Sequence, residues 1–253
     1  ETALQARAES EQRLRQFVAD ASHELRTPLA SIQGYTQLLQ KGSADEELAL
    51  ARIASESARM SGLVEDLLLL ARLDAGRELA NDPVDLIPLA IDAVSDAHAA
   101  GPDHEWVLDL PQFDDEDDVC VSCTVAGDES ALRQVFANLV NNARIHTPAG
   151  TRVKVGVQVI GGGASAPGFV RMSVADDGPG IPPELRATVF DRFVRGDTSR
   201  SRQGKGSSGL GLSIVSSIAE ALGGRVDVDT VCEGEAKPGE HGTTFSVILP
   251  AIS

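Results

Sequence analysis

Apolar residues in the first part of the chain recur with the three- and four-residue spacing of an α-helix. They form one narrow stripe along a segment that we interpret as a single long helix over residues 3–41. The stripe consists of Val18, Ala21, Leu25, Leu29, Ile32 and Leu39. Pro28 lies inside this segment and is expected to bend the helix, because proline removes one backbone donor and crowds the preceding turn.

A second helical pattern follows a polar turn at 41–45 and ends near Leu73. Its apolar positions predict a coiled-coil-type seam with a seven-residue repeat. One row comprises Ile53, Met60 and Leu67, and the expected companion row comprises Ser57, Val64 and Ala71. Two long helices joined by a short turn make an antiparallel hairpin, and a hairpin with one stripe per helix cannot close a core alone. We therefore expect residues 1–76 to form an all-α four-helix bundle from two copies, which is a homodimer.

The pattern changes after residues 77–82, which we interpret as a linker and hinge. From Pro83 onward, strand-like segments are mixed with separated helical ones without strict alternation. This order predicts a second domain over 83–253 with an α+β two-layer sandwich fold. Helices are expected at 86–99, 130–146 and 209–222, and strands at 105–110, 119–125, 152–160, 169–175, 225–231 and 243–249.

Composition narrows the possible partners. The formal net charge is −16, which argues against nucleic acid, because phosphate binding needs a basic face. No apolar run reaches the roughly 20 residues that span a bilayer, and the start does not resemble a signal peptide. The chain opens on Glu1 rather than methionine, so we interpret it as an excised fragment, which leaves room for a membrane segment upstream. Three cysteines, an odd number, favour a reducing compartment over a disulfide framework.

The first candidate chemistry lies on the long first helix. At about 100° per residue, His23 falls roughly 160° from the centre of the apolar stripe and is expected to face solvent. Thr27, one turn on, shares that face, and Glu24 is adjacent. An imidazole titrates near pH 6.5 and is nucleophilic at neutral pH, and a neighbouring carboxylate accepts the proton of its second nitrogen. An idle surface histidine is the alternative that this motif alone leaves open.

Three downstream segments carry residue types suited to a nucleotide. Asn138 and Asn142 share a helix face, and amide oxygens are acceptable ligands for Mg²⁺ that already carries phosphates. Asp176 follows an apolar strand and opens a glycine-rich segment, where a buried carboxylate accepts a hydrogen bond from an exocyclic amine. The segment 209–212 opens a helix, whose backbone N–H groups favour phosphate. Helix capping and an ordinary turn are the structural alternatives for the first two.

The segment 17–29, with its His-Glu-Leu-Arg-Thr-Pro-Leu core, resembles the H box of sensor histidine kinases. In that family the histidine receives the γ-phosphoryl group of ATP and passes it to an aspartate of a response regulator. The resemblance implies that His23 is the phosphoacceptor, that Glu24 assists its attack, and that Thr27 supports dephosphorylation of the regulator.

The downstream segments resemble, in order, the N, G1, F and G2 boxes and the terminal Gly-Thr-x-Phe segment of the ATP-binding domain in that family. The resemblance extends from about Leu14 to Leu249. It implies ATP and Mg²⁺ as cofactors, with Asn142 holding the metal and Asn138 beside it. It also implies that 183–208 is a lid anchored by Phe190 and Phe193. The implied nucleotide-binding residues are Asn138, Asn142, His146, Asp176, Gly178, Gly180, Ile181, Arg195, Lys205, Gly209, Leu210, Gly211 and Thr244.

Two positions depart from the family pattern. Ile145 stands where a lysine or arginine is frequent, and Arg144 lies one residue earlier, which turns the cation by about 100° on a helix. Ser207 stands where a glycine is frequent in the G2 segment.

The sequence therefore predicts an ATP-dependent protein-histidine kinase that phosphorylates itself on His23 and transfers the group to a response regulator receiver domain. Regulator phosphatase activity is also expected. We expect this to be the cytoplasmic portion of a bacterial sensor anchored in the inner membrane. Two alternatives remain. One is a nucleotide-binding module that shares only the ATPase fold, and the other is a regulator phosphatase or scaffold with weak kinase activity.

Overall fold

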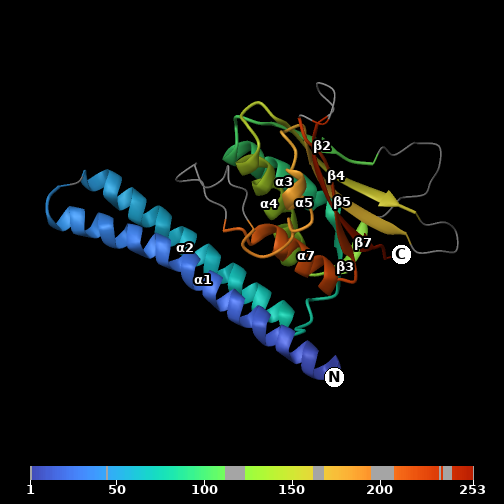
Figure 1. Cartoon of the computed structure of the whole chain (residues 1–253). Coiled ribbons are helices and arrows are strands. Elements are labelled where there is room, and N and C mark those ends of the chain that lie inside the picture. Colours follow the sequence, from blue (N-terminus) through green and yellow to red (C-terminus); the bar gives the residue numbers. More distant parts are fainter. Residues whose placement is uncertain are drawn as a thin grey trace. The chain divides into compact units, whose positions relative to one another are not determined.

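A computed structural model describes residues 2–43, 45–111, 123–161, 168–194, 208–233, 235 and 241–252, with side chains from Phe17 onward. The chain divides into two compact units, residues 1–71 and 72–253, and each is described by itself. Figure 1 shows a pair of long helices in the first unit and a sheet with helices in the second.

The first unit is a helical hairpin. Helix α1 spans Thr2–Gln40 and helix α2 spans Glu46–Asp74, with its last turn in the second unit. Both match the helices predicted from the apolar pattern. Helix α1 continues through Pro28, whose side chain is buried. A short turn joins the helices, so they run in opposite directions (Figure 1). No helix among the described residues combines the length and apolar character that crossing a bilayer requires.

The buried row of α2 differs from the expected one. Ala49, Leu63 and Leu70 are buried, with a half-buried Glu56 at the intervening seven-residue position. Within the hairpin of one chain, the predicted companion row of Ser57, Val64 and Ala71 is exposed, so it does not form the buried seam between α1 and α2. In the repeat that begins at Met60, the second buried position is therefore Leu63, three residues later, and not Val64, four residues later. Burial of Leu63 and Leu70 removes more apolar surface from water than burial of Val64 and Ala71 would.

The second unit contains eleven described helices and strands. The predicted helices and strands are present within a few residues of their expected bounds, and a short strand at 82–85 and a single helical turn at 183–186 were not expected. Of the strand predicted at 119–125, residues 119–122 lie outside the described part of the chain. In chain order the elements are β1 (Asp82–Asp85), α3 (Leu86–Ala100), β2 (Glu105–Asp109), β3 (Thr124–Gly127), α4 (Glu129–His146), β4 (Arg152–Ile160), β5 (Phe169–Asp176), α5 (Pro183–Arg186), α7 (Gly211–Ala221), β6 (Arg225–Val231) and β7 (Gly242–Pro250).

Five strands form the main sheet in the order β2-β4-β5-β7-β6. Strand β2 pairs with β4 in parallel and the other neighbours are antiparallel, while β1 and β3 form a separate antiparallel pair. Alternate residues of the central strands, such as Val155, Val174 and Phe245, are buried. Helices α4 and α7 contact each other and strands of this sheet, and α3 contacts α4. The α+β two-layer sandwich predicted from the sequence is therefore confirmed (Figure 1).

The register of the sheet sets the position of the site described below. Asp176, the last residue of β5, pairs with Thr243 at the start of β7. Because side chains alternate between the two faces of a strand, Asp176 shares the helix-covered face with Val174. Asp176 is only partly covered, because it lies at the end of that buried row. The sheet thus places a carboxylate at one edge of the apolar core.

Candidate functional site

The exposed histidine of the hairpin is where the pattern predicted it. His23 and Thr27 are exposed on α1, and Glu24 is half-buried. The Thr27 hydroxyl donates to the carbonyl oxygen of His23 at 3.5 Å, which is a long contact. Four residues make about one helical turn, so the imidazole and the hydroxyl lie on the same face. This face offers a solvent-accessible nucleophile with a carboxylate beside it and a hydroxyl one turn away.

In the second unit, Asp176 is the most strongly perturbed carboxyl group of the described residues. Burial raises its pKa to about 6, and this outweighs the backbone hydrogen bonds from Gly178 and Thr243, which lower it. The Gly178 N–H donates to Asp176 Oδ1 at 2.9 Å. A partly buried carboxylate with such a pKa is largely ionised above neutral pH and accepts further hydrogen bonds.

The loop after Asp176 requires its glycines. A Cβ at Gly178 would lie 2.6 Å from the methyl carbon of Thr147, and a Cβ at Gly180 would lie 2.3 Å from the carbonyl oxygen of Val231. Gly180 also has a φ of +77°, in the left-handed region that favours glycine. The backbone therefore packs directly against the end of α4 on one side and the end of β6 on the other.

Two helices of this unit meet at Asn138 and Gly211. A Cβ at Gly211 would lie 3.5 Å from Asn138 Oδ1, so α7 begins next to the middle of α4. The Asn138 Nδ2 group is buried and has no hydrogen-bond partner among the described residues. The residue that precedes α7, Leu210, provides no side-chain cap. An unpartnered amide donor beside an uncapped helix N-terminus fits an anionic group such as phosphate.

The remaining predicted residues are placed as follows. Asn142 is half-buried one turn beyond Asn138, and His146 is exposed at the end of α4. The Ile181 N–H donates to Thr230 Oγ1 at 2.9 Å. Arg195 and Lys205 lie outside the described residues. The structure therefore brings Asn138 next to Gly211 and Asp176 next to Gly178, and the assignment of these residues to one nucleotide site stays a prediction.

Two predicted contacts are placed differently from what their motif implied. The Leu210 side chain is fully buried in the core, so only its backbone is available to a ligand. Thr244 pairs with Ala175 and lies on the face of β7 opposite to Thr243. Thr243 is buried beside Asp176, and its hydroxyl lies 3.1 Å from Thr230 Oγ1. The structure thus brings Thr243, rather than Thr244, to the edge where Asp176 lies.

Sequence reasoning gave no role to two side chains that hold the loop. Thr147 is buried against Gly178 and donates to the carbonyl oxygen of Ala143 at 2.7 Å. His241 Nδ1 lies 2.7 Å from the carbonyl oxygen of Gly178. Thr147 directly follows the predicted helix 130–146, so its position as the residue that ends this helix could have been expected from the sequence. The pattern around His241 contained no such signal.

One hydrogen bond joins a residue within the predicted lid, 183–208, to the residue that directly follows it. The Phe193 N–H donates to the carbonyl oxygen of Gly209 at 2.8 Å. The ring of Phe190 packs edge-on against the buried ring of Phe245, with centroids 6.0 Å apart. Phe190 is therefore anchored in the core near one end of this segment.

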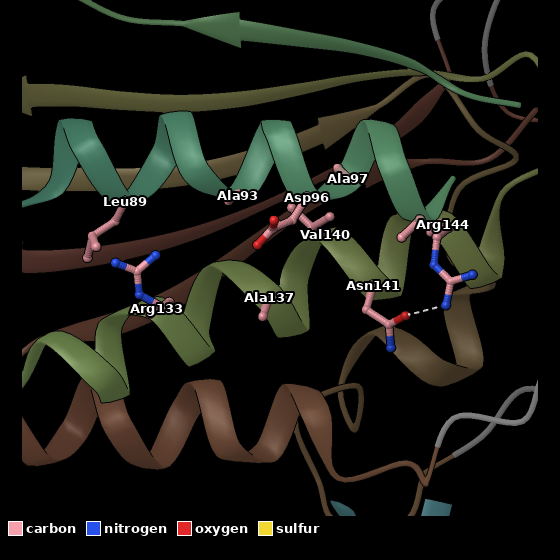
Figure 2. A pocket seen from close by; sticks show the side chains of 10 residues that line it. Leu89, Ala93, Asp96, Ala97, Arg133, Ala137, Val140, Asn141 and Arg144 are labelled. Carbon is pink, nitrogen blue, oxygen red and sulfur yellow. Dashed lines mark hydrogen bonds between the residues drawn. The ribbon is translucent and has the colours of Figure 1, made fainter. Parts of the chain in front are cut away.

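The opposite side of α4 lines a different feature. A groove of about 190 Å³ lies between α3 and α4, with Ala137, Asn141 and Arg144 on the α4 side (Figure 2). Arg144 donates to Asn141 Oδ1 at 2.7 Å there. Neither Asn138 nor Asn142 lines this groove. Arg144 thus lies on the side of α4 that faces α3. This agrees with the turn of about 100° expected because Arg144 stands one residue before position 145, where the family often has a cation.

Comparisons with known proteins agree with this geometry. Residues 127–253 match the model of the histidine kinase-, DNA gyrase B-, and HSP90-like ATPase family, and residues 13–76 match that of the His Kinase A (phospho-acceptor) domain. The probable sensor histidine kinase TcrY of Mycobacterium tuberculosis is 52% identical over 251 residues, which are 98% of this chain and 48% of TcrY. The chain belongs to the sensor histidine kinase family.

Two further comparisons concern another curated histidine kinase and a solved structure. The signal transduction histidine-protein kinase/phosphatase MprB of Mycobacterium leprae is 34% identical over 98% of the chain and 45% of MprB. The chain thus spans about half the length of these curated relatives. The solved structure of the histidine kinase ThkA in complex with the response regulator protein TrrA shares the fold, with a TM-score of 0.69 at 23% identity over 97% of this chain and 64% of that chain.

Proposed function

We propose that this chain is the transmitter region of a two-component sensor and acts as an ATP-dependent protein-histidine kinase. The observation that carries the proposal is the combination of exposed His23 on α1 with a second unit in which Asn138 presents a buried, unpartnered amide next to the uncapped start of α7. The first provides a phosphoryl acceptor and the second an anion site. Family membership supports the same assignment.

The nucleotide contacts follow from the chemistry of each group. The Asp176 carboxylate accepts a hydrogen bond from the exocyclic amine of adenine, and Gly178 and Gly180 let the loop beside it pack against Thr147 and Val231. The Asn138 amide and the first N–H groups of α7 bind the phosphates. Asn142 is half-buried on α4, and its side-chain amide oxygen is the proposed ligand for Mg²⁺. When bound there, Mg²⁺ would supply positive charge to neutralise the phosphates.

The reaction takes place at His23. One ring nitrogen forms a bond to the γ-phosphorus while the bond from that phosphorus to the β-bridging oxygen breaks, and ADP leaves. The proton of the other ring nitrogen passes to the Glu24 carboxylate. Catalysis is then mainly positioning of the two reactants and neutralisation of charge, as in other phosphoryl transfers. This requires the second unit to deliver the nucleotide to α1.

The proposed partners are a second copy of the chain and a response regulator receiver domain. The exposed apolar side chains of α1 and α2 support dimerisation, and the complex of ThkA with TrrA supports a regulator partner. Thr27 is proposed to orient a water in regulator dephosphorylation, and the kinase/phosphatase name of MprB supports this second activity. Anchoring of the whole protein in the inner membrane, with this region in the cytoplasm, stays a prediction.

Labelling with [γ-³²P]ATP tests the proposal. The purified chain is expected to take up label that is stable in alkali, labile in acid and absent from His23→Gln. The Asn142→Ala variant is expected to lose labelling together with Mg²⁺-dependent nucleotide binding. Label on another side chain, or no label under saturating Mg-ATP, overturns the kinase assignment. Calorimetry without detectable Mg-ATP binding would favour the phosphatase or scaffold alternative.

A further inference from the structure

His241 lies directly before β7, at the end of the sheet where β7 begins and where Asp176 is the last residue of β5. Its Nδ1 atom lies 2.7 Å from the carbonyl oxygen of Gly178, and the ring is half-buried. A carbonyl oxygen only accepts hydrogen bonds, so Nδ1 carries the proton. Both the neutral Nδ1–H tautomer and the imidazolium can donate this bond.

Gly178 is held at both of its backbone polar groups. Its N–H donates to Asp176 Oδ1 at 2.9 Å and its carbonyl oxygen accepts from His241 at 2.7 Å. Thr147 leaves no room for a Cβ at this position, so no larger residue can restrict the backbone there. Because glycine has the widest conformational freedom of any residue, an anchor supplied by the residue that precedes β7 limits the backbone orientations at Gly178.

A second hydrogen bond also holds this loop, but it joins two backbone groups. The Glu233 N–H donates to the carbonyl oxygen of Pro179 at 3.2 Å, which is a backbone contact that any non-proline residue at 233 supplies. At Gly178 the donor is a side chain, so this bond depends on the residue type at 241. Loss of the donor frees the Gly178 carbonyl and loosens one of the two N–H groups, those of Gly178 and Thr243, that hold the Asp176 carboxylate.

We propose that His241 is a positioning residue for recognition of the adenine base. It holds Gly178 so that the Asp176 carboxylate keeps the orientation that accepts the exocyclic amine. This inference rests on the proposed function, because it assigns Asp176 to the base. The Asn138 amide and the start of α7 lie at the phosphate part of the site, so His241 affects binding of the base and leaves phosphate binding unchanged.

Binding of two probes to the full chain separates these parts of the site. Mg-ATP carries the base, whereas Mg-tripolyphosphate carries only the phosphates. In His241→Leu, the Kd for Mg-ATP is expected to rise about tenfold, as for loss of one hydrogen bond of about 1.4 kcal/mol. The Kd for Mg-tripolyphosphate is expected to stay within twofold. Self-phosphorylation is expected to show a raised KM for ATP and an unchanged kcat.

Two further variants control for indirect effects. His241→Asn places an amide N–H near the position of Nδ1 and is expected to restore ATP affinity to within about threefold of the starting chain. His98→Leu makes the same chemical change on the exposed face of α3 and is expected to leave both Kd values unchanged. Melting temperatures of all three variants establish that they are folded.

The proposal is overturned if His241→Leu binds Mg-ATP as tightly as the starting chain, or if both probes weaken equally, which indicates a general structural role. It is also overturned if His241→Asn binds Mg-ATP as weakly as His241→Leu. Failure of the proposed function gives a different result, because the starting chain itself then fails to bind Mg-ATP or to label His23.

Discussion

The Phe193 N–H donates to the carbonyl oxygen of Gly209 at 2.8 Å, and this bond joins a residue within the predicted lid, 183–208, to the residue that directly follows it. Both residues have left-handed backbone conformations, with φ of +61° at Phe193 and +72° at Gly209. A non-glycine residue in this region costs of order 1–3 kcal/mol and persists only where its surroundings enforce it. The strain at Phe193 therefore marks this junction as a functional candidate.

Gly209→Ala is the sharpest test of this junction. A Cβ at Gly209 would lie 2.9 Å from Phe193 Cα, in addition to the left-handed backbone that alanine disfavours. The free energy of unfolding is expected to fall by about 2–3 kcal/mol, and Mg-ATP affinity is expected to fall as well. Urea denaturation and calorimetry measure the two effects.

The matched control for that variant is Gly223→Ala. Gly223 has nearly the same φ, +71°, but a Cβ there would meet no atom within 4 Å. Its cost is expected to be about 1 kcal/mol from the backbone alone, with ATP affinity unchanged. Equal losses of stability in the two alanine variants would contradict the close contact between Gly209 and Phe193.

Asp176→Asn is expected to stabilise the ligand-free domain at pH 8. The carboxyl group titrates at about 6 in the folded chain and near 3.8 in the unfolded chain. The folded state thus binds the proton more tightly, and stability falls as pH rises from about 4 to 6. Above this window the ionised group costs up to about 3 kcal/mol, at about 1.4 kcal/mol per pKa unit.

A neutral amide removes most of this cost, so the variant is expected to gain about 1–2 kcal/mol at pH 8 and little at pH 4. Denaturation at both pH values measures the difference. The exposed Asp229 provides the control, since Asp229→Asn is expected to change stability by less than 0.5 kcal/mol at either pH. An Asp176→Asn variant that is less stable than the starting chain at pH 8 would refute burial as the cause of the raised pKa.

The raised pKa of the Asp176 carboxyl group also predicts how nucleotide binding depends on pH. Only the ionised Asp176 carboxylate is an acceptor at both oxygens, so protonation below pH 6 removes a favoured contact with the adenine amine. The Kd for Mg-ATP is expected to rise several-fold between pH 7.5 and pH 5.5. Mg-tripolyphosphate, measured in parallel, corrects for protonation of the phosphates. Equal pH dependence for the two probes would remove Asp176 from base recognition.

Much of this site was predictable because its residues occur in local motifs. Asp176, Gly178 and Asn138 follow from short segments whose chemistry is legible in sequence. His241 was missed because its contact depends on the register of β5 and β7, which joins residues 63 positions apart. Thr244 was chosen in place of Thr243 although the threonine of the Gly-Thr-x-Phe segment falls on Thr243, and a shift of one residue moves the choice to the other face of the strand.

The fold shows the same division. Long periodic helices and alternating strands were located closely, whereas β1 was not expected. The segment Asp82–Asp85 contains a single buried apolar residue, Val84, so it has no alternation to detect. It becomes a strand through its pairing with β3, which is a tertiary effect. The buried row of α2 was misplaced by one residue for a related reason, since packing against α1 decides between neighbouring rows.

Thr27→Ala separates the two activities proposed for the hairpin. Its hydroxyl is exposed and makes only a 3.5 Å contact with the His23 carbonyl oxygen, so stability is expected to change by less than 0.5 kcal/mol. Labelling of His23 is expected to continue at the starting rate. Dephosphorylation of a phosphorylated regulator is expected to slow at least tenfold. Serine at this position keeps the hydroxyl and serves as the control, and equal phosphatase rates for the alanine and serine variants would discard the role of Thr27.

The exposed apolar side chains of α2 predict where two copies meet. Val64 and Leu68 are 42% and 53% exposed on one face of the helix, and α1 of the same chain does not cover them. Leu68→Glu places a charge in the proposed interface and is expected to shift the chain from dimer to monomer at micromolar concentration. Leu48, which is 57% exposed, lies about 160° around the same helix from Leu68 and supplies the control Leu48→Glu. Sedimentation velocity distinguishes the outcomes. Dimer loss in both variants would indicate a general effect of charge, and dimer loss in neither would exclude this face of α2 from the interface.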